Sequence, residues 1–310
     1  MANLGVGCYI GNWYSGALAY ADDIVLIAPS ANAMRKMLRF CEQYAIEYNI
    51  MFNADKSKCI FFPTKGCAGR LHTRRPVFHI NNSAVEYVEQ WPHLGHVISS
   101  DLDDKHDISR GRSALVSQIN NVLCFFRTLD GVTKMRLLIS YCYSLYGCVI
   151  WDITSAHVEK VCSAWRAGVR RVWGLPLNTH NVLIPLISNR LSLYDEIRKR
   201  MLTFIQGCLL SESDLVSFVT RHAVWFGRMS SPVGRNAFHC CHRFDVPLDK
   251  LLYVTPRFVY DFCISKVDSE SVHLAYSLLE LVFVRSGSFS VSKDFADTDI
   301  QTMIDALCTA

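Results

Sequence analysis

Residues 17–28 read ALAYADDIVLIA and place two adjacent carboxylates, Asp22 and Asp23, between two apolar runs. The flanking runs, 17–20 and 24–28, have the composition of strands, and the residues between them are few enough to form the turn of a hairpin. Two like charges side by side at the end of a strand cost free energy unless cations or hydrogen-bond donors compensate them. This cost is the first indication of a functional site.

The sequence on either side of this stretch extends the pattern. Val6–Ile10, the turn pair Gly11-Asn12 and then Trp13-Tyr14 predict an earlier hairpin, because Gly and Asn tolerate the positive φ of tight turns. Pro29 ends the second apolar run, and Ser30 is a good N-cap for a helix. Apolar residues then recur at the helical period, at Met34, Met37, Leu38, Cys41, Tyr44, Ala45 and Tyr48. We expect this helix to cover one face of the sheet.

Short strands and turns follow the helix. The segment Asn53-x-x-Lys56-Ser57 predicts a turn that leads into a strand at Cys59–Phe62, which Pro63 ends. A further short strand, Val77–Ile80, ends at Asn81-Asn82. Two later apolar segments, 85–88 and 91–98, suggest another hairpin. The latter segment contains His93, Leu94 and Gly95.

Several of these elements together carry a family resemblance. Tyr20-Ala21-Asp22-Asp23 between apolar strands, the amphipathic helix, Asn53-x-x-Lys56-Ser57 and His93-Leu94-Gly95 occur in the order of a polymerase palm. The sequence resembles the later palm of the reverse transcriptases that non-LTR (LINE-type) retrotransposons encode. The resemblance covers about the first hundred residues, and reaches the helical remainder by analogy with a thumb and a C-terminal segment.

The resemblance implies an α+β fold with three regions. Residues 1–100 would form a partial palm of antiparallel hairpins plus a helix, 101–176 a thumb-like helical region, and 177–310 a helical C-terminal region of unknown role. It also implies an RNA-directed DNA polymerase that extends a DNA primer on an RNA template with dNTPs and Mg²⁺. Such nucleotidyl transfer uses two divalent ions, so carboxylates must converge at one point.

The resemblance also implies roles for particular residues. Asp22 and Asp23 would bind the metal, and Lys56 would lie near the incoming triphosphate as a cation or proton donor. Tyr20 would contact nucleic acid. His93, Leu94 and Gly95 would form the turn that grips the primer end. Plainer interpretations stay open: a solvated turn for the two aspartates, a surface lysine, and an ordinary hairpin turn at Leu94-Gly95.

One part of the family's metal site has no counterpart here. The family has another metal-binding Asp on an earlier strand, whereas residues 1–21 contain no Asp or Glu. The dense acidic segment Asp101–Asp107 lacks the Gly and the closing Glu of a calcium loop, and a helix start is the simpler interpretation. We therefore expect an N-terminally truncated fragment that is inactive alone, because half a two-metal site neither holds its ions nor aligns an in-line attack.

The middle of the chain reads as three helices. The first has apolar residues at helical spacing between Ile108 and Leu129 and stops at Asp130-Gly131. Thr133 is predicted to cap the second, an apolar helix that runs through Met135–Trp151 and is too short and too polar to span a membrane. The third helix is predicted at Ser155–Trp173 and ends at Gly174.

The third helix carries arginines beside tryptophans. Arg166, Arg170 and Arg171 lie near Trp165 and Trp173 in the sequence. In the family this region would be the thumb, which packs on the template–primer duplex, and arginines with stacking aromatic rings suit that role. An amphipathic helix with a basic outer face is an equally good interpretation.

The last third of the chain shows little chemistry. Helices are predicted at Val182–Ile187, Leu191–Leu210 and Val272–Val284. Four ring-bearing residues are expected in irregular stretches between these helices, namely His222, Trp225, His239 and His242. A zinc site is not favoured, since the contiguous His239 to His242 segment lacks a matching second pair of ligands.

Composition limits the possible classes of protein. The 310 residues are 50% hydrophobic, which excludes disorder as the main state. The net charge of +4 permits a nucleic-acid partner without demanding one. The 13 cysteines are an odd number and no signal peptide opens the chain, so we expect reduced thiols in an intracellular protein, nuclear or cytoplasmic, that is neither secreted nor bound to a membrane.

Two alternatives to a polymerase fragment remain open. One is a non-catalytic nucleic-acid-binding module that acts through the basic segments Lys65–Arg75 and Arg166–Arg171. The other is a helical interaction protein that binds neither nucleic acid nor metal and has a large apolar surface. Salt-sensitive binding that ignores Asp22 would favour the first alternative, and no salt-sensitive binding the second.

Overall fold

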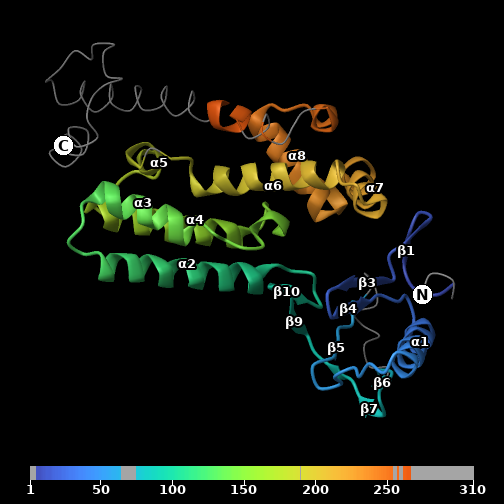
Figure 1. Cartoon of the computed structure of the whole chain (residues 1–310). Helices are drawn as coiled ribbons and strands as arrows, with labels where there is room; N and C mark the ends of the chain where they lie inside the picture. The colour runs from blue at the N-terminus through green and yellow to red at the C-terminus, as the bar shows by residue number, and fades with distance from the viewer. Residues whose placement is uncertain (1–4, 64–74, 189, 254–256, 258–260, 267–310) are drawn as a thin grey trace, which may run out of the picture. The chain divides into compact units, whose positions relative to one another are not determined.

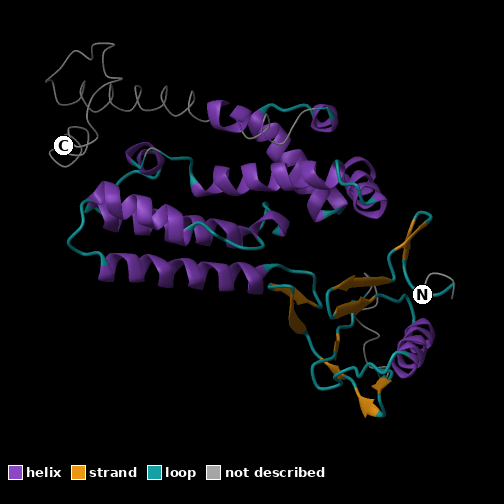
Figure 2. Ribbon diagram, viewed as in Figure 1, coloured by secondary structure: helices purple, strands orange, loops and turns teal. Residues whose placement is uncertain are grey.

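The computed structural model describes residues 5–63, 75–188, 190–253, 257 and 261–266, and it divides into two compact units (Figure 1). The first unit comprises the described residues up to Asp104 together with Ser213–Leu215. The second comprises those from Lys105 to Glu212 and from Val216 onward. The described residues up to Asp104 form short strands, one helix and loops, and those from Lys105 on form helices with connecting loops (Figure 2). Apart from residues 101–104 and 213–215, the described residues of both predicted helical regions fall in the second unit.

The strands of the first unit are paired two by two. They are β1 (Tyr9–Ile10), β2 (Trp13–Tyr14), β3 (Ala17–Tyr20), β4 (Asp23–Leu26), β5 (Lys58–Cys59), β6 (His79–Ile80), β7 (Ser83–Ala84), β8 (Glu86–Tyr87), β9 (Gln90–His93) and β10 (His96–Ser99). The pairs β1–β2, β3–β4, β6–β7 and β9–β10 are antiparallel hairpins, whereas β5 and β8 pair in parallel. The predicted hairpins at Gly11-Asn12 and Asp22-Asp23 and the predicted turn at Leu94-Gly95 are confirmed. The hairpin predicted between segments 85–88 and 91–98 is wrong, because β8 pairs with β5 and β9 pairs with β10.

Helix α1 (Ala31–Glu47) begins where the sequence predicted. The Ser30 hydroxyl accepts a hydrogen bond from the Ala33 amide at 3.2 Å, which confirms the N-cap. The predicted apolar face is confirmed at Met37 and Ala45, which are buried, and is wrong at Tyr44 and Tyr48, which are exposed. The two tyrosines stack on each other with ring centroids 4.3 Å apart. The helix contacts β6 and does not cover a continuous sheet, since the described strands form separate pairs.

Two strand predictions needed correction. The predicted strand Cys59–Phe62 is shorter, since β5 ends at Cys59, and Phe61 and Phe62 are exposed. The hairpin β6–β7 was missed, although Asn81 and Asn82 form its turn with φ of +49° and +63°. Positive φ at both central residues is the pattern of a type I′ turn, which asparagine tolerates well.

The described helices after β10 are α2 (Lys105–Phe125), α3 (Gly131–Cys142), α4 (Ala156–Trp173), α5 (Leu183–Ile187), α6 (Leu193–Leu209), α7 (Asp214–Arg221) and α8 (Pro232–Phe244). Three 3₁₀ turns (Cys148–Ile150, Arg228–Ser230 and Leu248–Leu252) and a π-helical turn (His222–Gly227) lie between or after these helices, and residues 261–266 are also helical. Helix α2 packs along α4, with α3 against both, and α6 packs on α8 (Figure 1). The backbones of α2 and α4 approach closely at Gly168, where an added Cβ would lie 2.8 Å from Cδ1 of Ile119.

Helix α4 agrees with its prediction at both ends. The Ser155 hydroxyl accepts from the His157 amide, and Gly174 ends the helix in the left-handed conformation with φ of +64°. The helix predicted through Trp151 is wrong in both its cap and its length. The cap is Asp130, whose carboxylate accepts from the Thr133 amide at 2.9 Å, and α3 ends at Cys142.

The chain after α3 turns back too sharply to continue as a helix. Leu145 and Gly147 have φ of +33° and +83°, which an α-helix cannot accommodate. The histidine placements were also wrong: His239 and His242 lie on α8, and His222 and Trp225 lie in the π-helical turn. The predicted helix Val272–Val284 lies outside the described residues.

A buried carboxylate ties the start of α2 to the loop after α3. Asp107, with 0% of its surface exposed, accepts from Trp151 Nε1 at 2.7 Å and from Arg110 Nη2 at 2.5 Å. The prediction that residues 101–107 lead into a helix is confirmed, since α2 begins at Lys105. Asn236 of α8 holds the same loop, because its side chain bonds the Ile153 amide and the Trp151 carbonyl. Asp107 therefore serves packing in the helical unit.

A second polar cluster on α6 makes the stability of this unit depend on pH. Lys199 Nζ and Arg200 Nε donate to the Glu196 carboxylate at 2.6 and 2.8 Å, and its side chain is only 14% exposed. Burial is the largest single influence and raises the pKa of Glu196, but the hydrogen bonds and charges of Lys199 and Arg200 outweigh it. The pKa of the folded state therefore lies below the ordinary value.

Stability of the helical unit is expected to fall in acid for this reason. The unfolded chain takes up protons near the ordinary glutamate pKa, about 4.3, while folded Glu196 stays charged. Its contribution is therefore complete above that pH and disappears as the pH falls through the folded-state pKa. The free energy of unfolding can be measured in urea at pH values from about 3 to about 7. As the pH falls, it should decrease more steeply for the wild type than for Glu196→Gln. Equal slopes would contradict the assignment.

Candidate metal site at the Asp22–Asp23 hairpin

The hairpin β3–β4 has a turn of two residues. Tyr20 and Asp23 are cross-strand partners, so Ala21 and Asp22 form the turn and Asp23 is the first residue of β4. The sequence had placed Asp23 in the turn. Ala21 has φ of +52° and Asp22 a negative φ, the pattern of a type II′ turn, in which glycine is usual at the first position. The chain thus accepts strain of about 1–2 kcal/mol at Ala21.

The tip of this hairpin is open to solvent. Asp22, Asp23 and Ile24 are exposed, and Tyr20 is 68% exposed. Because cross-strand partners share a face, Tyr20 and Asp23 lie side by side on one face of the hairpin. A ring with a hydroxyl group therefore stands beside a carboxylate at the site.

Neither aspartate is neutralised within the described part of the chain. No hydrogen bond or ion pair joins the side chain of Asp22 or Asp23 to another described residue. Adjacent carboxylates without a cationic partner repel each other, and a hard divalent cation relieves that repulsion through oxygen ligands. The donor set therefore fits Mg²⁺, which is bound in many proteins by one or two carboxylates while water and phosphate oxygens complete the octahedron.

Within residues 5–63, 75–188 and 190–253, no group of three or more His, Cys, Asp or Glu side chains gathers to hold a metal. The pair at the hairpin is thus a partial ligand set in the described structure. The acidic residues before α2 have partners of their own. Asp101 accepts hydrogen bonds from the Ser99 hydroxyl and the Asp103 amide, and an Asp104 carboxylate oxygen lies 3.8 Å from His96 Nε2.

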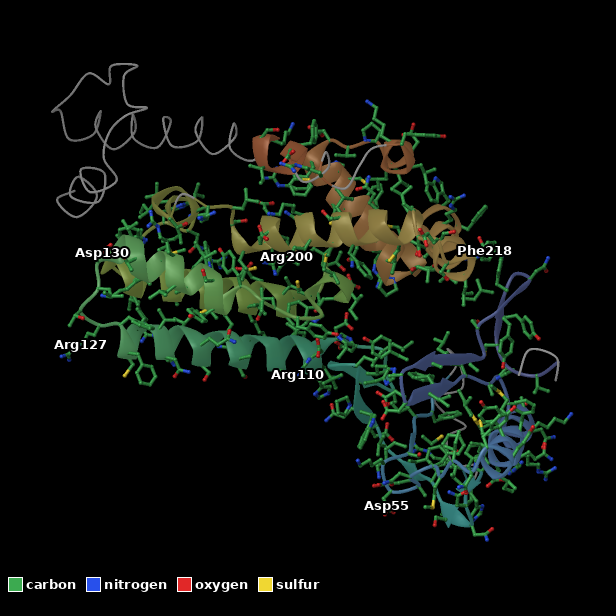
Figure 3. The ribbon with its side chains drawn as sticks, in the orientation of Figure 1. Asp55, Arg110, Arg127, Asp130, Arg200 and Phe218 are labelled. Carbon is green, nitrogen blue, oxygen red and sulfur yellow. The ribbon has the colours of Figure 1, made fainter. Side chains whose placement is uncertain are left out.

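Lys56 lies where the sequence placed it, in a turn that enters a strand. Asn53 Oδ1 accepts from the Lys56 amide at 3.0 Å, and the Ser57 hydroxyl donates to the Asn53 carbonyl. These bonds fix the backbone of the turn and leave the Lys56 side chain exposed. Figure 3 labels the neighbouring Asp55 on this turn.

The segment His93-Leu94-Gly95 forms the tip of the β9–β10 hairpin. Leu94 and Gly95 have φ of +47° and +78°, so both central residues of the turn are left-handed. A left-handed leucine is unfavourable, as is the left-handed Ala21 at the other tip. Strained residues of this kind gather at functional sites more often than elsewhere, and the sequence offered no signal for either of them.

The structure places the predicted site residues on three separate turns of the first unit. These turns belong to β3–β4, to the segment before β5, and to β9–β10. Among the described residues, no side-chain hydrogen bond or ion pair connects Asp22 or Asp23 with Lys56 or His93. The grouping of these three turns into one site therefore rests on the resemblance.

The arginines of α4 all have partners inside the protein. Arg166 pairs with Glu159, Arg170 donates to the Thr179 carbonyl and Asn181 at 2.7 Å each, and Arg171 donates to Asn120 of α2 at 2.7 Å. Burial, with a smaller contribution from Arg166, lowers the pKa of Arg170.

Trp165 is buried in the core, so it cannot stack on nucleic acid. These contacts favour the interpretation of α4 as an amphipathic helix that organises its neighbours. Of the other basic segment, Lys65 and Arg70 lie outside the described residues, and Arg75 pairs with Glu89 at 3.0 Å.

The described cysteines are free thiols, and none of the described helices is both long and apolar enough to cross a membrane. No model of a known protein family matches the sequence. The chain is 27% identical over 169 residues to an uncharacterized transposon-derived protein of Caenorhabditis elegans. The match covers 52% of this chain and 57% of that protein, so the chain spans little more than half of its relative's length. This similarity, although distant, supports a transposon-related origin for the chain.

Proposed function

We propose that the chain is part of the RNA-directed DNA polymerase of a non-LTR retrotransposon, and that Asp22 and Asp23 bind Mg²⁺ at its polymerase centre. The observation that carries the proposal is the exposed, unneutralised carboxylate pair at the tip of a tight hairpin. The similarity to a transposon-derived protein supports the origin in a mobile element. Exposure at a hairpin tip leaves room for phosphates and water to complete the coordination of a cation.

The proposed chemistry is transfer of a nucleotide to the 3′ end of a DNA primer on an RNA template. When bound, Mg²⁺ ions stabilise charge on the attacking oxygen and on the leaving pyrophosphate. Asp22 and Asp23 hold the ions through their carboxylates. Tyr20, beside Asp23, offers a ring on which a sugar or base of the substrate packs.

The other two turns have complementary roles in this proposal. Lys56 lies on a turn in which Asn53 accepts hydrogen bonds from the Lys56 amide and the Ser57 hydroxyl. In this proposal its side chain lies near the triphosphate of the incoming dNTP and neutralises part of its charge. The tip at His93, Leu94 and Gly95 contacts the primer end, and its exposed left-handed Leu94 presents an apolar side chain there.

Metal binding tests the proposal without requiring catalysis. Mn²⁺ substitutes for Mg²⁺ and broadens the NMR signals of nearby nuclei, so a titration should first affect the amides of residues 20–24. The Asp22→Asn variant is expected to bind Mn²⁺ about tenfold more weakly, because one of two charged ligands is lost. Asp55→Asn, a change at another exposed turn aspartate of the same unit (Figure 3), should leave the affinity unchanged.

Two results would contradict the metal assignment. One is Mn²⁺ affinity in Asp22→Asn equal to that of the wild type. The other is broadening centred on the acidic residues 101–104 and absent from the hairpin.

A further inference from the structure

Three rings form a row on the surface of the helical unit, outside the candidate metal site. Phe218 of α7 and His222 and Phe226 of the following π-helical turn are four residues apart in sequence. The ring centroids of Phe218 and His222 are 6.3 Å apart, and those of His222 and Phe226 are 5.6 Å apart. Adjacent rings are tilted by 34° and 35°. We refer to these three residues as the aromatic row.

The outer end of the aromatic row is open to solvent. Phe226 is 80% exposed and His222 is exposed, while Phe218 is partly buried at the inner end. Figure 3 labels Phe218 on α7. An exposed phenylalanine that continues a row of rings leaves a large apolar face in water, which is typical of a binding surface.

Helix α7, which carries the inner end of the aromatic row, begins with one acidic residue, Asp214, four residues before Phe218. From there on, residues 215–244 contain four arginines and three histidines and no aspartate or glutamate. Arg235 and Arg243 of α8 are engaged with Asp152 and Asp195. Arg221 is exposed and directly precedes His222. Helix α8 packs against the π-helical turn and adds His239 and His242 to this segment. Arg221 therefore offers an exposed cation beside the outer part of the aromatic row, where a phosphate can contact it.

Surfaces that recognise single-stranded nucleic acid combine exposed aromatic rings with cationic side chains. Unpaired bases stack on exposed aromatic faces, and arginine contacts the phosphates between them. A protein partner with an aliphatic surface would gain nothing from the ring of His222 or the charge of Arg221. We infer that the aromatic row binds single-stranded nucleic acid, with bases on Phe226 and His222 and a phosphate on Arg221. This inference does not depend on the role of Asp22 and Asp23.

Binding of a fluorescein-labelled oligouridine to the full chain, followed by anisotropy, tests the inference. Phe226→Ala is expected to weaken binding about tenfold, the loss associated with one stacked base. Phe226→Trp should retain the affinity, because a larger ring still stacks. Phe125→Ala is the matched control, since Phe125 at the end of α2 is 78% exposed, and this variant should bind like the wild type.

The salt dependence of binding separates the contribution of base stacking from that of the phosphate contact. The Arg221→Gln variant should reduce the slope of log Kd against log salt by about 0.7, the value for one phosphate contact on a single strand. Phe226→Ala should bind Mn²⁺ at the hairpin like the wild type, so that failure of this inference is distinct from failure of the metal assignment. Circular dichroism confirms that each variant is folded.

Either of two outcomes would overturn the inference. The first is equal affinity of wild type and Phe226→Ala for oligouridine. The second is loss of self-association in Phe226→Ala, measured by analytical ultracentrifugation, with oligouridine binding unchanged; this result would make the aromatic row an interface between copies of the chain.

Discussion

Replacement of Asp22 by asparagine is expected to lower RNA-templated primer extension about a thousandfold, since several kcal/mol of charge stabilisation would be lost at the metal. Asparagine keeps the size of the side chain and the turn, so the hairpin should persist. The structural basis is the exposed pair at the β3–β4 tip, which no described residue neutralises. The measurement is incorporation of labelled dNTPs on an oligoadenylate template with an oligothymidine primer and Mg²⁺.

Asp55→Asn is the control for this experiment, because Asp55 is an exposed aspartate on another turn of the same unit. Its rate should equal that of the unsubstituted protein. Extension that persists undiminished in Asp22→Asn would refute the role of Asp22 as a metal ligand. If the unsubstituted protein binds Mn²⁺ at the hairpin but extends no primer, it is not a polymerase by itself, and the sequence-based expectation of an inactive fragment stands.

Replacement of Asp107 by alanine is expected to destabilise the helical unit by about 3 kcal/mol. The change removes a fully buried acceptor and leaves the Trp151 Nε1 proton, also buried, without its 2.7 Å partner. The bond to Arg110 adds less, because half of the arginine side chain is exposed and water screens the pair. Urea unfolding followed by circular dichroism at 222 nm reports mainly on these helices.

Two variants divide the expected loss between its causes. Asp107→Asn keeps an oxygen for Trp151 and should cost roughly 1 kcal/mol, while Arg110→Ala removes a half-exposed partner and should cost less than about 1 kcal/mol. A loss below about 1 kcal/mol in Asp107→Ala would show that water or another acceptor takes the place of the carboxylate.

Elements whose ends are set by local signals could be predicted from the sequence. Helix α4 has Ser155 at its start and Gly174 at its end, and each acts on the backbone within a few residues. The same holds for the β9–β10 turn, where Gly95 tolerates its left-handed φ. These features need no knowledge of distant segments.

Features that depend on distant segments could not be predicted. Asp107 and Trp151 are 44 residues apart, so no local pattern distinguishes Asp107 from the neighbouring acids as the buried one. Tyr44 and Tyr48 fit the helical period, yet no described element covers them, and they stack on each other in solvent. Periodicity reports which side chains share a face and does not report what packs against that face.

The sequence predicts the residues of the candidate site better than it predicts their arrangement. Asp22 and Asp23 could be identified because the repulsion between adjacent carboxylates depends only on their being neighbours in the chain. Their relation to Lys56 and His93 depends on how separate hairpins assemble, which sequence spacing does not determine. The aromatic row was missed because His222 was assigned to an irregular stretch. The four-residue spacing of Phe218, His222 and Phe226 was the available signal.

The pairing pattern of the first unit also implies an order of folding. The β3–β4 hairpin joins partners across two residues, and such hairpins form within about 1–10 μs. The parallel pair β5–β8 joins Lys58 to Glu86, so a long loop must close before any bond of that pair forms. The carboxylate pair therefore acquires its local geometry early, from a short piece of chain, whereas the turn that carries Lys56 is anchored only once the long-range pair has formed.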